Sequence, residues 1–91
     1  PRQADVEPPA TPANITGTVT ANSITLTWDV ASGAQKYVIH RSGVLISEEI
    51  SPTFTDADIP SNTTFEYTVT SYNSNNTPSE PSEPVSFTTS A

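Results

Sequence analysis

Strict alternation of apolar and polar residues marks the stretch before the only tryptophan of the chain. Ile24, Leu26 and Trp28 are apolar, whereas the residues between and beside them are Ser, Thr or Asp. A period of two places alternate side chains on opposite faces of an extended strand, so this stretch predicts a half-buried β-strand. Because Trp28 shares its face with Ile24 and Leu26, we expect its indole in a core and not on a ligand-binding surface.

The same alternation recurs along the chain, and Thr, Val, Ile and Tyr dominate these runs. Nowhere do apolar residues repeat at helical spacing, so we expect no helix longer than a turn. Turn-forming residues separate the runs, for example Ser42-Gly43. Seven short strands are predicted, at about 13–19, 23–29, 36–41, 44–47, 53–56, 63–72 and 82–89.

Strands with one apolar face require a partner layer. Evenly spaced antiparallel strands bury that face by packing two sheets against each other. The pattern therefore predicts an all-β sandwich, and a chain of 9.7 kDa has room for one such domain.

The first twelve residues differ in composition from the rest. Residues 1–12 contain four of the nine prolines and show no apolar period. Proline-rich segments favour the polyproline II conformation, which rises about 3.1 Å per residue. We interpret residues 1–12 as a linker and residues 13–91 as the folded domain.

Five segments in order resemble the fibronectin type III domain, a seven-stranded antiparallel immunoglobulin-like β-sandwich. The form is most similar to the bacterial version found in modular secreted polysaccharide-degrading enzymes, whose third strand carries a tyrosine, an apolar pair, an arginine and a turn glycine. The matching segments are Pro12 followed by Ile15, ITLTWD with Trp28, YVIHRSG at 37–43, TFTDADIPSNTTFEYTVTSYN at 53–73 and SEPSEPVSFTT at 79–89.

One corner departs from the family pattern. The usual Leu-x-Pro-x-Thr-x-Tyr motif reads here as residues 59–65, with Phe65 in place of the tyrosine. The hydroxyl bond of that corner is therefore absent, a loss of about 0.5–1.5 kcal/mol. We expect a soft spot here unless Tyr67 supplies a substitute hydroxyl.

Charge and composition exclude several classes of function. A net charge of −7 repels phosphate backbones, so nucleic acid is not an expected partner. No apolar run approaches the roughly 18–20 residues that a bilayer demands, so no membrane span is expected. With no cysteine and one histidine, the chain offers no ordinary zinc site, and we expect no cofactor.

No catalytic residue is predicted. His40 has the strand parity opposite to Ile39, which assigns it to a solvated sheet face and not to a cleft. Asp56 and Asp58 could offer oxygens to calcium, but the surrounding loop motif is missing. We interpret both as solvating a turn and a strand edge.

The resemblance implies a non-catalytic spacer between modules of a secreted bacterial polysaccharide hydrolase, such as a chitinase or cellulase. An odd number of antiparallel strands places the two ends of the domain at opposite poles, which suits this role. Expected partners are the neighbouring modules, and the chain is expected to be monomeric and extracellular. The alternative is an adhesion module that binds carbohydrate or protein, through Tyr72, the one aromatic with outward parity, or through an exposed edge strand.

Overall fold

The computed structural model describes residues 8–91, which form seven β-strands and no helix. The strands are β1 (Thr16–Val19), β2 (Ser23–Thr27), β3 (Lys36–Arg41), β4 (Val44–Glu49), β5 (Thr53–Ala57), β6 (Thr64–Tyr72) and β7 (Val85–Thr88). Within this part of the chain, no helix could cross a bilayer.

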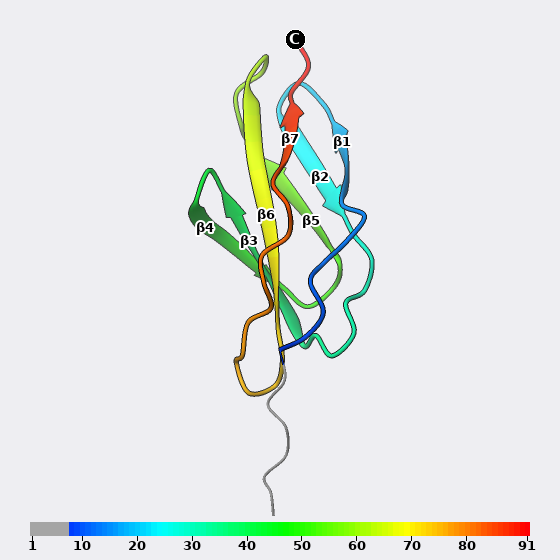
Figure 1. The fold of residues 1–91 in the computed structure, drawn as a ribbon. Helices are drawn as coiled ribbons and strands as arrows, with labels where there is room; N and C mark the ends of the chain where they lie inside the picture. The colour runs from blue at the N-terminus through cyan, green and yellow to red at the C-terminus, as the bar shows by residue number, and fades with distance from the viewer. Residues whose placement is uncertain (1–7) are drawn as a thin grey trace, which may run out of the picture.

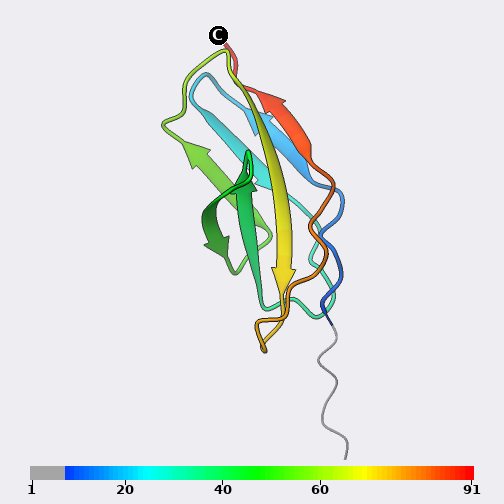
Figure 2. The same ribbon diagram turned by 60° about the vertical axis from the view of Figure 1, so that its left-hand side comes forward.

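The strands form two antiparallel sheets that pack face to face (Figure 1 and Figure 2). One sheet has the order β1-β2-β5 and the other the order β4-β3-β6-β7. This arrangement confirms the predicted all-β, seven-stranded antiparallel immunoglobulin-like sandwich.

The core lies between the sheets and consists of the side chains that face inward from each strand. Trp28 is 3% exposed, and its ring meets that of Tyr37 edge-on with centroids 5.4 Å apart. Leu26 and Ile39 are fully buried beside them. The prediction that Trp28 is a core residue is therefore confirmed.

A two-residue turn joins β3 to β4. Ser42 and Gly43 both have positive φ angles, 52° and 83°, which is the backbone geometry that matches the twist of a tight hairpin. Past the turn, the register shifts between Ile39 and His40, because Ile39 lies opposite Ser47 whereas His40 lies opposite Leu45. This bulge bends β4 at the free edge of its sheet.

Four predicted strands are longer than the observed ones, and one of them, at 63–72, is longer by a single residue because β6 begins at Thr64. The first begins at Thr16 and not at residue 13, because Asn14 has a φ of 58° that interrupts the extended conformation. The second ends at Thr27, although the backbone N–H of Trp28 still donates to the carbonyl of Pro52. The last begins only at Val85, directly after Pro84.

Serine side chains replace part of the missing ladder before β7. In the repeat SEPSEP, the prolines carry no backbone N–H, so regular pairing with β6 stops. Ser79 Oγ accepts from the N–H of Ser71, and Ser79 N–H donates to the carbonyl of Ser71. Ser82 makes the same two bonds with Val69. Each serine thus forms hydrogen bonds with both the backbone N–H and the carbonyl of one β6 residue.

The corner between β5 and β6 is closed by a threonine. Phe65 has no hydroxyl, and that of Tyr67 bonds elsewhere, as described below. Instead, Thr89 Oγ1 accepts from the N–H of Thr63 at 3.0 Å and donates to the carbonyl of Pro60 at 2.8 Å. Thr89 is 1% exposed, so this pair of bonds supplies what the missing tyrosine hydroxyl would have given the corner.

Residues 8–12 lie against the domain, although the sequence assigned them to the linker. Pro9 and Pro12 are buried, and the N–H of Ala10 donates to the carbonyl of Ser32 at 2.9 Å. The remaining residues of the predicted linker, 1–7, lie outside the described residues. The boundary between linker and domain at residue 12 stays a prediction.

The ring of Phe87 in β7 lies directly on Gly17 of β1. A Cβ at position 17 would lie 2.6 Å from Cε1 of Phe87, closer than packed carbon atoms allow. We expect Gly17→Ala to lower the free energy of unfolding by about 1–3 kcal/mol through overpacking. Urea denaturation followed by Trp28 fluorescence measures the change. Gly17→Ala combined with Phe87→Leu should recover part of the loss, and an unchanged midpoint in Gly17→Ala would contradict the contact.

Candidate functional site

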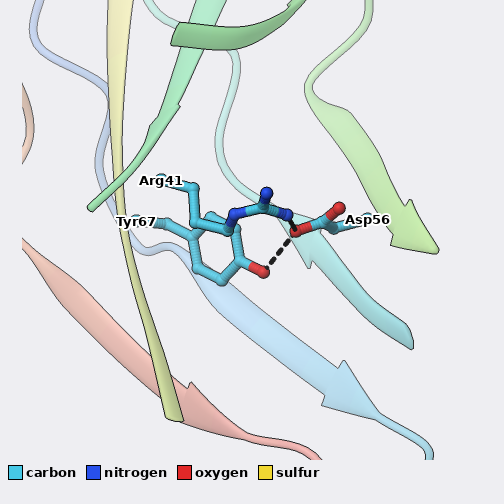
Figure 3. A network of polar contacts seen from close by, with 3 residues as sticks. All are labelled: Arg41, Asp56 and Tyr67. Carbon is cyan, nitrogen blue, oxygen red and sulfur yellow. Dashed lines mark hydrogen bonds and ion pairs between the residues drawn. The ribbon is translucent and has the colours of Figure 1, made fainter. Parts of the chain in front are cut away.

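The most concentrated group of functional side chains is Arg41, Asp56 and Tyr67, drawn in Figure 3. Arg41 and Tyr67 come from β3 and β6 of the four-stranded sheet, whereas Asp56 comes from β5 of the three-stranded sheet. Arg41 has the inward parity of Ile39, and Asp56 shares the parity of Phe54, which packs on the core. The three polar groups therefore meet between the sheets.

One carboxylate oxygen accepts both hydrogen bonds of the group. Asp56 Oδ2 lies 2.6 Å from Nη1 of Arg41 and 2.7 Å from the hydroxyl of Tyr67. Tyr67 is fully buried, and the side chain of Asp56 is 9% exposed. Only Arg41 reaches solvent, with 32% of its side chain exposed, and its guanidinium lies 5.4 Å from the ring centroid of Phe65.

The surroundings of this network raise the pKa values of its tyrosine and arginine. Burial, followed by the hydrogen bond to Asp56, raises the pKa of the Tyr67 hydroxyl well above its usual value. The hydrogen bond to Asp56 also raises the pKa of Arg41. Both shifts favour a neutral Tyr67 hydroxyl and a charged Arg41 guanidinium in the folded domain.

The prediction for Asp56 was wrong, because the sequence reading assigned it to solvent. The sequence already indicated that Asp56 lies on the same face of its strand as Phe54. It also indicated that the charged Arg41 faces inward. A buried charge needs a partner of opposite charge, and this requirement would have predicted an ion pair between Arg41 and Asp56. Asp58, two residues on, is exposed as expected, with a φ of 59°.

Tyr72, the predicted binding residue, lies half-buried at the end of β6. The ammonium of Lys36 lies 5.4 Å from the centroid of its ring, and the same ammonium lies 3.4 Å from Oε1 of Glu48. A cation thus already occupies one face of the ring, which leaves less of it for stacking on a sugar.

The outer face of the four-stranded sheet also contains a buried aliphatic residue. Val38 is 2% exposed, although the alternation along β3 directs its side chain away from the core. It lies opposite Glu48 of β4 and Thr70 of β6. His40 follows on the same face, half-buried opposite Leu45 and Thr68.

A groove of about 540 Å³ runs between the segment before β1 and the segment before β7. Thr11, Asn14, Glu80 and Glu83 supply its polar wall, and Ile15 supplies part of its apolar wall. None of the network residues lines it. In residues 8–91, no three His, Asp or Glu side chains gather in a way that could hold a metal ion.

Comparison with known proteins identifies the fold. No family model matches the chain. An Fn3-like protein from Clostridium thermocellum superposes with a TM-score of 0.78 and 26% identity, covering 88% of this chain and 92% of that one. The fibronectin type III domain of human fibronectin type III domain containing protein 3 superposes with the same TM-score of 0.78 at 22% identity, covering 98% of this chain and 93% of that one.

The chain has the fold of a fibronectin type III domain. A chitinase from Bacillus thuringiensis contains a domain of this fold that superposes with a TM-score of 0.88 at 22% identity, covering 98% of this chain and 14% of the chitinase. The fibronectin type III resemblance seen in the sequence is thereby confirmed.

Three curated relatives share this domain with much longer chains. An alpha-amylase of Niallia circulans is 38% identical over 79% of this chain, and an exoglucanase B of Cellulomonas fimi is 33% identical over 94%. A poly(3-hydroxybutyrate) depolymerase of Ralstonia pickettii is 33% identical over 77%. This chain spans only 6%, 8% and 14% of their respective lengths.

The raised pKa of Tyr67 predicts a loss of stability of this fibronectin type III domain in alkali. Below pH 10 the hydroxyl is protonated in both the folded and the unfolded chain. As the pH rises above 10, the unfolded chain releases this proton and the folded domain does not. The free energy of unfolding should then fall by up to about 1.4 kcal/mol for each pH unit on account of this residue.

Urea denaturation between pH 8 and pH 12 measures this decline. Tyr67→Phe should cost about 1.5–3 kcal/mol at neutral pH, because a hydrogen bond to a charged group is lost, and it should show a shallower alkaline decline. Tyr72→Phe removes a hydroxyl outside the network and serves as the matched control. Equal slopes for the native chain and Tyr67→Phe would contradict the assignment.

Proposed function

We propose that this fibronectin type III domain is a non-catalytic spacer that sets the distance and direction between neighbouring modules of a longer, secreted, polymer-degrading chain. The observation that carries the proposal is that both ends of the domain are fixed by hydrogen bonds at opposite poles of an elongated body. Figure 1 shows that the described chain begins near one end of the long axis of the domain and reaches its C-terminus at the other.

The first pole is tied down by the segment that precedes β1. Asn14 Nδ2 donates to Asp29 Oδ2 at 2.6 Å, and the N–H of Asp29 donates to the carbonyl of Ala13. Ala10 bonds Ser32 further along the same two segments. This series of bonds, together with the buried Pro9, gives the entering chain a defined direction up to residue 9.

The second pole is tied down by the segment that follows β7. The N–H of Ser90 donates to the carbonyl of Thr20, and the carbonyl of Ser90 accepts from the N–H of Asn62. The chain is therefore held in place until its last residue but one. A domain with two anchored exits transmits orientation, whereas one with loose ends does not.

The relatives favour a role that does not depend on the substrate. Their names refer to an amylase, an exoglucanase and a depolymerase of poly(3-hydroxybutyrate), which is a polyester and not a sugar polymer. A domain shared by enzymes for such different polymers suits spacing better than recognition of one of them. A tether of this kind raises the local concentration of a neighbouring module on an insoluble polymer.

The absence of a catalytic role is part of this proposal, and so is an extracellular location. Arg41, Asp56 and Tyr67 are engaged with one another between the sheets, with Tyr67 fully buried. The stability of the domain rests on no thiol chemistry, because the chain lacks cysteine. It therefore needs no oxidising compartment to fold and tolerates one equally well.

A fluorescence experiment tests the spacer directly. Cysteines introduced at the exposed positions Thr11 and Ser90 of this cysteine-free chain accept two dyes, one near each pole. We expect single-molecule energy transfer to give one narrow distribution in the native state, unchanged by polymer. A broad or multiple distribution, in a chain whose unfolding transition is intact, would contradict a fixed separation.

A pull-down distinguishes the spacer from a carbohydrate-binding module. The chain is incubated with insoluble chitin, cellulose and starch, and with poly(3-hydroxybutyrate). We expect no retention on any of them, because Lys36 covers one face of the Tyr72 ring. Retention that disappears in Tyr72→Ala and persists in Tyr37→Phe would overturn the spacer in favour of the binding alternative.

A further inference from the structure

The apolar side chains that this domain leaves in solvent are concentrated on one edge. Among the described residues, five large hydrophobic side chains are exposed: Val19, Val30, Val44, Leu45 and Ile50. Three of them, Val44 at 63%, Leu45 at 53% and Ile50 at 84%, lie on β4 or directly after it. Single exposed aliphatic residues need no explanation, but several along one edge strand point to an interaction surface.

The strand that carries these residues has a free side. In the sheet order β4-β3-β6-β7, β4 is hydrogen-bonded to β3 alone. Figure 1 shows β4 at the margin of the molecule, away from the C-terminus. Its outer backbone groups are therefore available for pairing with another extended segment.

Charge specifies what kind of segment fits there. Glu48 and Glu49 end the strand, and Lys36 is the one basic residue that pairs with either of them among the described residues. The whole chain carries a net charge of −7, so a second copy would be repelled. A segment bearing lysine or arginine opposite the two glutamates would be attracted.

The bulge in β4 limits the length of that segment. Because the register shifts at Ile46, the edge divides into a short apolar part at Val44 and Leu45 and a short acidic part at residues 47–49. A bulged edge discourages the open-ended stacking of flat strands. It still accepts one short strand, and β4 contains no aromatic ring on which a sugar could stack.

We propose that the β4 edge binds a short, extended, basic segment of polypeptide by strand addition. Backbone pairing with β4 supplies part of the affinity, and aliphatic side chains of the segment pack on Val44 on one face of the sheet and on Leu45 on the other. Lysine or arginine side chains of the segment pair with Glu48 and Glu49. This surface is separate from both anchored poles, so the domain can act as a spacer and hold such a segment at the same time.

An NMR titration tests this proposal on the 91-residue chain. The probe is a synthetic hexapeptide of alternating lysine and valine, and the matched control is a hexapeptide of alternating glutamate and valine. We expect the lysine peptide to shift the backbone amides of residues 44–50, with weaker binding as salt is added. The glutamate peptide should not bind.

Two matched variants assign the effect to the edge. Leu45→Lys should raise the dissociation constant at least about tenfold, because one large aliphatic contact is lost and a like charge is added. Val19→Lys adds the same charge on β1, in the other sheet, and should change the constant less than about twofold. Both positions are exposed, and thermal unfolding followed by Trp28 fluorescence confirms that each variant is folded.

Other outcomes overturn the proposal. These are the absence of shifts at about 1 mM peptide, equal binding of both peptides, or shifts confined to residues outside β4. Self-association of the chain that Leu45→Lys abolishes would identify a second copy as the occupant and would also contradict it. The energy-transfer experiment on the spacer does not involve β4, so the two proposals succeed or fail independently.

Discussion

A single buried carboxylate oxygen connects the two sheets of this domain. Asp56 Oδ2 belongs to the three-stranded sheet, and both of its hydrogen-bond donors, Arg41 and Tyr67, belong to the four-stranded sheet. The hydrophobic effect presses the sheets together but has no direction, whereas this group has a required geometry. Removing either donor would leave a buried charge short of a partner, which costs more than the pair contributes. The network therefore specifies how the sheets lie on each other, in a chain that has no disulfide to do so.

The same network engages side chains that could otherwise carry chemistry. Tyr67 is buried between the sheets and donates to Asp56, and Arg41, part of whose side chain reaches solvent, donates to the same carboxylate oxygen. On the outer face, Lys36 joins Glu48 and Tyr72 above Val38, which is 2% exposed. Tyr72, which the sequence offered as a binding residue, is thus engaged by Lys36 on the outer face of the four-stranded sheet. The exposed aliphatic residues of β4 are the exception, since no contact within the described chain accounts for them.

Alternation alone was enough to predict the strands, the sandwich and the place of Trp28, because inward and outward positions are set by the local backbone. The hairpin at Ser42 and Gly43 was equally visible, since few residues adopt two successive positive φ angles. Asp56 was misplaced because its partners lie 15 and 11 positions away in the sequence, and parity was not applied to a charged residue. The closure of the corner by Thr89 could not be anticipated from composition, because it depends on the register between β6 and β7.

The central claim is that this fibronectin type III domain is a sealed scaffold whose specialised side chains face inward and whose ends are fixed. The most direct test is the quenching of Trp28 fluorescence by iodide in the native chain, with and without suspended chitin, cellulose and starch. The account predicts emission shifted to short wavelength, a quenching constant far below that of the urea-unfolded chain, and no change on adding polymer. Efficient quenching in the native state, or a spectral shift caused by any of the polymers, would contradict it.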